Sequence, residues 1–158
     1  MQYRVVPKNG DTLSALGYGC MRMPMKDGKL DKARAIAQIR KAIDSGVNYV
    51  DTAWPYHAGE SETLLGRALQ DGYREKVKVA TKLPCWMIKT RDDMERFLSA
   101  QMRKLGVHCI DYYLLHALNG PAWDAINGQG VSSFLEDAKA AGRIGNIGFS
   151  FHGLGADF

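Results

Sequence analysis

The chain lacks the sequence features of several protein classes. Its three cysteines, Cys20, Cys85 and Cys109, are odd in number, far apart and without a Cys-x-x-Cys pair, so neither a disulfide framework nor a zinc site is expected. No apolar run approaches the roughly 20 residues of a membrane-spanning helix, and the first residues do not form the apolar core of a signal peptide. We therefore expect a cytoplasmic protein with no metal and no membrane partner.

Charge is also modest in amount and not clustered. The 21 Lys and Arg residues against 17 Asp and Glu residues give a formal net charge of +4, and the basic residues do not form a stripe with interleaved aromatics. Nucleic-acid binding is therefore not expected. What the chain does have is 46% hydrophobic residues in a length of 158, enough for the core of one ordinary domain. We predict a single domain over residues 1–158.

Helical and strand-like segments alternate along most of the chain. Apolar residues recur at the i, i+3, i+4, i+7 spacing of one buried helix face in four segments: 32–45, 62–71, 91–105 and 132–141. Short apolar segments, typical of strands covered on both faces, lie between them: 47–51, 77–82, 110–116 and 144–150. Alternation of this kind predicts a parallel sheet with helices.

Capping residues mark where the predicted helices begin and end. Asp31 and Thr90 stand where a side-chain oxygen would accept a bond from a free amide of the first turn. Each helix is followed by a glycine, the residue that most easily forms a left-handed C-cap: Gly46, Gly72, Gly106 and Gly142.

The first 21 residues complete the fold prediction. An Asn9-Gly10 pair between strand-like segments predicts a hairpin over 3–13, and the apolar, glycine-containing segment 16–21 predicts a first buried strand. A closed eight-unit barrel takes about 250 residues, so we predict an α/β fold that is a partial TIM (β/α)8 barrel, about the first five strands and four helices, preceded by a short β-hairpin. An open doubly wound sheet is the alternative, but the segment 17–22 lacks the third glycine of its phosphate-binding loop.

Residues capable of proton chemistry end three successive predicted strands. They are Asp51, Lys82 and His116, and Tyr56 lies in the loop after the first of these strands. Active sites of β/α barrels lie at the C-terminal ends of the strands, so a carboxylate, an ammonium, an imidazole and a phenol are expected at one rim. Taken singly, each residue has an ordinary structural explanation, as a turn cap, a solvated strand end, a core histidine or a half-buried aromatic. Their conjunction favours a site.

The segments around these residues resemble the aldo-keto reductase family. The resemblance is carried, in family order, by LGYGCMR at 16–22, GVNYVDTAWPY at 46–56, ESETLLG at 60–66, ATK at 80–82, IDYYLLH at 110–116 and GRIGNIGFS at 142–150. It covers essentially the whole chain, as the N-terminal half of a family barrel. It is strongest for the microbial branch whose longer members carry a cysteine-rich iron-sulfur segment after the barrel, and no such segment occurs in these 158 residues.

The resemblance implies NADPH-dependent reduction of an aldehyde or ketone, with Asp51, Tyr56, Lys82 and His116 as the catalytic tetrad. Hydride addition leaves negative charge on the carbonyl oxygen, so Tyr56 is the candidate general acid. An ammonium about 4 Å from a phenolate stabilises it by on the order of 4 kcal/mol at an effective dielectric of 20, and burial opposes this. Asp51 would keep Lys82 charged and oriented, while His116 would hydrogen-bond the substrate oxygen or help shuttle the proton.

The resemblance also assigns contacts to bound molecules. NADPH contacts fall on Cys20, Met21, Asp51 and Ser150. Relatives place Ser-Asn after the fifth strand, whereas this chain has Ser150-Phe151-His152, so the serine transfers and the asparagine does not, with His152 a conceivable substitute donor. The family holds the adenosine phosphate with late strands and loops of the barrel, so we expect these residues alone to bind NADPH weakly or not at all.

Aromatic residues near the predicted rim supply candidate substrate contacts. Trp54, Trp86 and Trp123 fall in predicted loops on that side, where tryptophan could line a pocket or pack the loops down. We count Trp54, Trp86 and His116 as candidate contacts of a small carbonyl substrate.

Two other functional hypotheses remain open. One is a noncatalytic barrel fragment that keeps the site residues and acts by protein interaction, and the other is the first part of a larger iron-sulfur redox protein. Half a barrel leaves two sheet edges unpaired, and exposed edges recruit other chains. We therefore expect either that the chain is a piece of a longer protein or that it self-associates by pairing with a second copy through these edges.

Overall fold

The computed structural model describes residues 1–153. The barrel pattern predicts that a further helix would follow the fifth strand, and the place where it would begin lies outside the described residues. The strands are β1 (Tyr3–Val5), β2 (Thr12–Ser14), β3 (Tyr18–Gly19), β4 (Met25–Lys26), β5 (Lys29–Leu30), β6 (Tyr49–Asp51), β7 (Lys78–Leu83), β8 (Ile110–Leu118) and β9 (Ile144–Phe151). The α-helices are α1 (Lys32–Asp44), α2 (Ser61–Ala68), α3 (Arg91–Leu105), α4 (Gly120–Asn127) and α5 (Val131–Ala140). Short 3-10 turns follow three of the central strands: Cys20–Arg22, Tyr56–Gly59 and Cys85–Met87.

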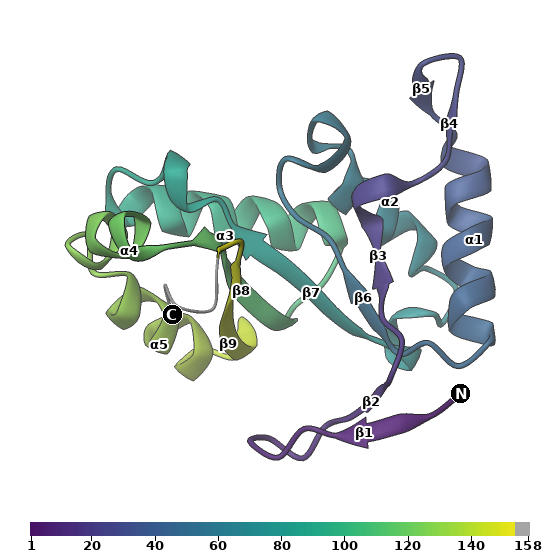
Figure 1. Cartoon of the computed structure of the whole chain (residues 1–158), viewed down its shortest axis with the longest axis horizontal. Helices are drawn as coiled ribbons and strands as arrows, with labels where there is room; N and C mark the ends of the chain where they lie inside the picture. Colours follow the sequence, from purple (N-terminus) through teal and green to yellow (C-terminus); the bar gives the residue numbers. More distant parts are fainter. Residues whose placement is uncertain (154–158) are drawn as a thin grey trace.

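Five strands form one parallel sheet in the order β3-β6-β7-β8-β9. The helices stand along it from α1, near β3, to α5, near β9 (Figure 1). Because the strands are parallel and follow one another in chain order, their C-terminal ends meet at one rim. The predicted α/β architecture, a hairpin followed by the first five strands of a barrel, is confirmed.

Side chains of each strand alternate between the helices and the opposite face. On β8, the Tyr113 hydroxyl is fully buried and donates to Gln101 of α3, whereas the Tyr112 hydroxyl donates to Asp11 of the β1–β2 hairpin. Leu115 therefore faces the helices and His116 faces away from them. Because of this alternation, apolar side chains form a core between the sheet and the helices, and polar side chains such as Tyr112 and His116 lie on the opposite face.

The helix ends follow the predicted capping residues. The Asp31 side chain accepts a bond from Arg34 N–H at the start of α1, and Thr90 and Asp93 form a reciprocal capping box at the start of α3. Gly46, Gly106 and Gly142 have positive φ angles, between 68° and 96°, directly after α1, α3 and α5, as a left-handed C-cap requires. The prediction for Gly72 was wrong, because α2 already ends at Ala68 with Leu69 as its C-cap.

Three local elements differ from the sequence prediction. The first strand covers only Tyr18–Gly19, because Cys20–Arg22 turns into a 3-10 helix. A second hairpin, β4–β5, turns at Asp27 and Gly28. Trp123 lies in helix α4 and not in a loop, which makes five α-helices where four were expected within residues 1–153.

The β1–β2 hairpin is joined to the lower end of the sheet by polar contacts. The Asn9 amide donates to Tyr112 Oη at 2.9 Å and to Asn146 Oδ1 at 2.8 Å, and Lys78 Nζ lies 3.0 Å from Asp11 Oδ1. These contacts lie at the rim opposite to the C-terminal strand ends. Within residues 1–153, no helix is long and apolar enough to cross a membrane, and no group of three side chains is arranged to hold a metal ion.

Candidate active site

The structure brings Asp51, Tyr56, Lys82 and His116 together at the C-terminal rim of the sheet. Asp51 ends β6, Lys82 lies near the end of β7 and His116 near the end of β8, while Tyr56 opens the turn after β6. The parallel registry of neighbouring strands aligns these ends side by side.

The Lys82 ammonium is the centre of the cluster. Its side chain is 6% exposed, and Nζ donates to Asp51 Oδ1 at 2.6 Å and to the Thr52 carbonyl at 2.7 Å. The third donor is directed at Tyr56 Oη, 3.5 Å away. Burial raises the pKa of the Asp51 carboxyl, and the Lys82 charge opposes that shift. An ammonium has three N–H donors. Two of them bind Asp51 and Thr52, and the third is left for the Tyr56 hydroxyl.

His116 faces Tyr56 and Trp86. Its ring centroid lies 6.0 Å from that of Tyr56, edge to face, and 5.0 Å from that of Trp86. The imidazole is 7% exposed, and its Nδ1 has no hydrogen-bond partner among residues 1–153. Burial, together with the Lys82 charge, lowers the pKa of His116 to about 4 from 6.5. The imidazole is therefore neutral near pH 7, with an unsatisfied polar atom at the cluster.

The loop that carries Tyr56 has an unusual backbone. His57, Ala58 and Gly59 follow Tyr56 with φ angles of 52°, 53° and 87°. For residues with a side chain, the left-handed region costs about 1–2 kcal/mol each. His57 Nε2 accepts a hydrogen bond from Met23 N–H at 3.2 Å, which ties this loop to the segment after β3.

The predicted cofactor residues lie at two places on the same rim. The Cys20 side chain is fully buried and burial raises its pKa to about 12, so contact with a bound molecule falls to its backbone or to Met21, which is 57% exposed. Ser150, on β9, accepts a bond from Ala117 N–H at 2.8 Å, and its own hydroxyl proton can still be donated. Ser150 thus supplies a hydroxyl donor that could bind a polar ring such as a nicotinamide.

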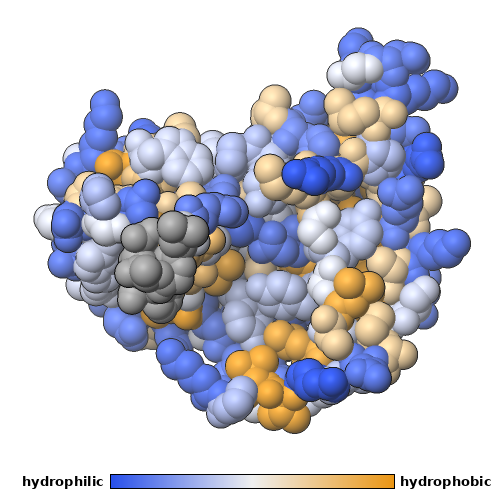
Figure 2. All heavy atoms as spheres, viewed as in Figure 1, coloured by the Kyte–Doolittle hydropathy of each residue, from blue (hydrophilic) through white to orange (hydrophobic). Residues whose placement is uncertain are grey.

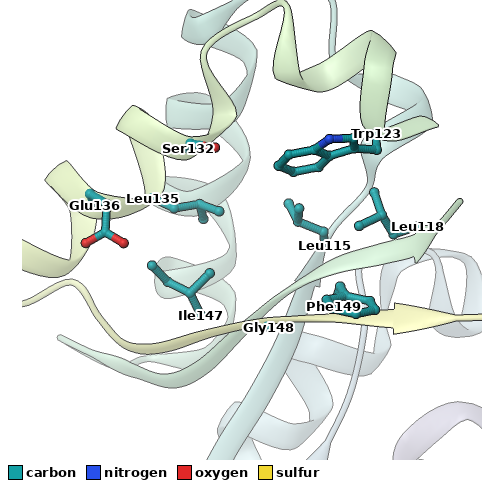
Figure 3. A pocket seen from close by; sticks show the side chains of 9 residues that line it. All are labelled: Leu115, Leu118, Trp123, Ser132, Leu135, Glu136, Ile147, Gly148 and Phe149. Atoms are coloured by element: carbon teal, nitrogen blue, oxygen red, sulfur yellow. The ribbon is translucent and has the colours of Figure 1, made fainter. Parts of the chain in front are cut away.

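The three tryptophans lie in three different environments. Trp86 is 58% exposed beside His116, where it can meet a ligand. Trp54 packs edge to face on Phe97 of α3, with centroids 4.8 Å apart. Trp123 lines a separate apolar groove of about 450 Å³ between α4, α5 and the helix-facing side of β8 and β9 (Figure 3). That groove lies on the opposite face of the sheet from His116, so it is not the predicted substrate pocket.

A buried polar network behind Lys82 was not anticipated. Glu62 and Gln101 are fully buried; the Gln101 amide donates to Glu62 Oε1 at 2.6 Å and to the Lys82 carbonyl at 3.0 Å. The Thr81 hydroxyl donates to the same Glu62 oxygen at 2.7 Å. One signal was available in the sequence: Gln101 is four residues after Phe97 and four before Leu105, on the apolar face of the helix.

Comparison with known proteins places the chain in a family. The model of the aldo/keto reductase family matches residues 15–156. The NADH-specific methylglyoxal reductase of Escherichia coli is 30% identical over 159 residues, a match that takes in 87% of this chain and 48% of that protein. The chain thus spans about half the length of this curated relative.

Solved structures give the same result. The holo form of aldo-keto reductase AKR11C1 from Bacillus halodurans superposes with a TM-score of 0.80 at 26% identity, over 96% of this chain and 50% of that one. An aldo-keto reductase from Klebsiella pneumoniae in complex with NADPH superposes with a TM-score of 0.78 at 27% identity, over 94% of this chain and 49% of that one. With the family model matching most of its length, this chain belongs to the aldo/keto reductase family.

Proposed function

We propose that the protein is an NADPH-dependent oxidoreductase that reduces an aldehyde or ketone by hydride transfer, with Tyr56 as the general acid. The observation that carries the proposal is the position of one buried ammonium, Lys82 Nζ, 2.6 Å from Asp51 Oδ1 and 3.5 Å from Tyr56 Oη. Family membership supports an oxidoreductase, and the NADPH complex of the Klebsiella structure supports the choice of cofactor.

The proton step follows from these contacts. A bound nicotinamide cofactor supplies the hydride, and the carbonyl oxygen then gains negative charge. Tyr56 accepts a bond from Lys82, which leaves its own proton free to pass to that oxygen. The Lys82 charge stabilises the phenolate that remains, and Asp51 holds the ammonium in place.

His116 would orient the substrate oxygen as a neutral donor. Its low pKa keeps the ring uncharged near pH 7, and the adjacent Trp86 ring offers an apolar surface to the rest of the substrate. Cys20, through its backbone, and Met21, Asp51 and Ser150 stay the proposed cofactor contacts. Trp54 stays a proposed substrate contact on the sequence prediction alone, because its ring packs on Phe97.

The direct test measures NADPH oxidation with an aromatic aldehyde. The native chain is compared with Tyr56→Phe, and NADH is run in parallel because the E. coli relative is named as NADH-specific. Because these residues alone are expected to bind NADPH weakly, the assay uses a high concentration of the cofactor. Loss of a general acid lowers the rate by about 10² to 10⁴, so we expect a loss of that size in Tyr56→Phe, with the same quenching of tryptophan fluorescence by NADPH in both proteins. Absence of both turnover and quenching in the native chain would contradict the enzymatic proposal.

The interaction hypothesis is the second candidate, because this chain covers about half of its relatives. A fragment that keeps the tetrad but binds no nicotinamide would act through other chains, by its sheet edges. A cytoplasmic location, and a place in a larger iron-sulfur protein, also stay proposals that rest on the sequence.

A further inference from the structure

We propose that Lys104, on helix α3, is a positioning residue for Tyr56, because its ammonium fixes the strained loop that carries the phenol. The functional meaning of this inference rests on the proposed role of Tyr56 as general acid. The fixing of the loop itself can be tested without turnover.

The loop needs contacts from outside to keep its shape. Two residues with side chains, His57 and Ala58, have left-handed φ angles of 52° and 53°, followed by Gly59 at 87°. Backbone in such sparsely populated regions persists only where the surroundings hold it. Tyr56 immediately precedes these residues, so whatever holds them also sets the direction of the phenol.

Lys104 contacts the chain on both sides of Tyr56. Its Nζ lies 3.5 Å from the centroid of the Trp54 ring, two residues before Tyr56. The same atom donates to the Gly59 carbonyl at 3.3 Å, three residues after it. A cation over an indole and a charge-assisted hydrogen bond are both directional contacts, and together they enclose the loop.

The ammonium is itself held by a buried carboxylate. Lys104 Nζ lies 3.4 Å from Glu62 Oε2, and the Glu62 side chain has no exposed surface. A buried carboxylate needs an opposite charge and hydrogen bonds, and the other oxygen of Glu62 has bonds from Thr81 and Gln101. Lys104 therefore has a fixed partner at the start of α2.

Close packing of two helices sets the position of Lys104. A side chain on Gly66 of α2 would place its Cβ 2.6 Å from the Lys104 carbonyl, so glycine lets α2 lie directly against the end of α3. Trp54 in turn packs on Phe97 of α3. The loop, α2 and α3 thus form one packed unit, and the polar centre of that unit is the Lys104 ammonium.

The opposite side of the loop has its own contact. His57 accepts from Met23 N–H, and Met23 is 4% exposed. Lys104 fixes the end of the loop that leads into α2. Without the ammonium, the Gly59 carbonyl and Glu62 both lose a donor, and the 3.5 Å separation of Lys82 Nζ and Tyr56 Oη is no longer enforced.

Hydrogen exchange of the 158-residue chain tests this inference. The peptide covering 54–60 contains the Tyr56 and Glu60 amides, which donate to Ala53 and His57 carbonyls, and a peptide covering β7 serves as reference. The variants are Lys104→Met, which keeps most of the apolar stem and removes the charge, and Lys104→Arg, which keeps charge and donors. Arg103→Met, an exposed neighbour, is the matched control.

We expect exchange in 54–60 to become at least about tenfold faster in Lys104→Met relative to the β7 peptide. Lys104→Arg and Arg103→Met should exchange as the native chain does. Unchanged exchange in 54–60, or acceleration equal to that of β7, would overturn the inference. If the 54–60 peptide exchanged as fast in Lys104→Arg as in Lys104→Met, the proposal that the positive charge fixes the loop would be overturned.

Turnover separates this inference from the proposed function. If the chain reduces aldehydes, Lys104→Met should lower kcat and leave the KM for NADPH unchanged, because the residue acts on Tyr56 and not on cofactor contacts. If the native chain shows no turnover, the proposed function fails while the exchange result still decides the role of Lys104.

Discussion

Lys82 and His116 are both buried in the site, but their charged neighbours differ. Lys82 is buried but has a carboxylate at 2.6 Å, so its charge is compensated. His116 is equally buried but has Lys82 as its charged neighbour, and both burial and that charge lower its pKa. The residue pair thus joins a fixed positive charge to a neutral ring, which suits a reaction in which negative charge develops between them.

The low pKa of His116 predicts a pH dependence of stability. Between pH 6.5 and about 4 the unfolded chain binds more protons at this residue than the folded chain does, so the free energy of unfolding should fall as the pH falls through that window. The contribution is fully present above pH 6.5. Urea unfolding followed by tryptophan fluorescence at pH 4.5 to 7.5 measures the slope.

His116→Gln should flatten that slope, since a neutral amide does not titrate. His108, an exposed histidine, supplies the control, and His108→Gln should keep the native slope. Equal slopes in the native chain and His116→Gln would show that the imidazole is not held neutral by the fold.

At the scale of elements, the contact between α2 and α3 depends on one glycine. A Cβ at Gly66 would lie 2.6 Å and 2.7 Å from the carbonyl oxygens of Lys104 and Leu105, which are backbone atoms that cannot rotate away. Gly66→Ala should therefore destabilise the fold by about 1–3 kcal/mol, the usual cost of overpacking, although alanine is the better helix former.

Gly120→Ala is the control for this prediction. Gly120 also lies in a helix, α4, and a Cβ there would meet nothing within 4 Å. We expect no loss of stability, or a small gain. If chemical denaturation showed equal stability changes in the two variants, the effect of Gly66→Ala would come from helix propensity and not from the contact between α2 and α3.

The same elements show what the sequence could predict. Helix α3 was predicted at its observed limits, Arg91 to Leu105, because five apolar residues repeat on one face and Thr90 and Gly106 mark its ends. Helix α4 was missed because it has only eight residues and one buried side chain, Ile126. The Asp27-Gly28 pair is a recognised hairpin signal and would have revealed β4–β5.

The sequence predicted the residues of the candidate site but not the residues that hold them in place. Asp51, Lys82 and His116 could be placed at one rim because strand ends of a parallel sheet align. The left-handed residues His57 and Ala58, and the contact of Lys104 with Trp54, depend on how a loop packs on a distant helix. Local sequence patterns carry no information about that packing.

At the scale of the whole molecule, the sheet has two edges, β3 and β9. Apolar residues gather near the β1–β2 hairpin and the start of β3 (Figure 2), where Val5 and Leu16 are 63% and 62% exposed. On the β9 side, the apolar groove of about 450 Å³ opens between the sheet and α4 and α5. Exposed apolar surface beside a sheet edge favours association with other chains.

We therefore predict that the 158-residue chain self-associates. Light scattering after size-exclusion chromatography should give a mass above the 17.5 kDa of one chain, rising with concentration. A compact monomer that unfolds cooperatively at all concentrations would contradict this prediction.

The central claim is that a hydride acceptor binds beside Tyr56 and receives its proton from that phenol. The most direct measurement uses NADPH with deuterium at both C4 positions and an aromatic aldehyde, followed by mass spectrometry of the alcohol. We predict one deuterium on the carbinol carbon with the native chain, and alcohol formation about 10² to 10⁴ slower with Tyr56→Phe. Alcohol without deuterium, or equal rates in the two proteins, would contradict the account.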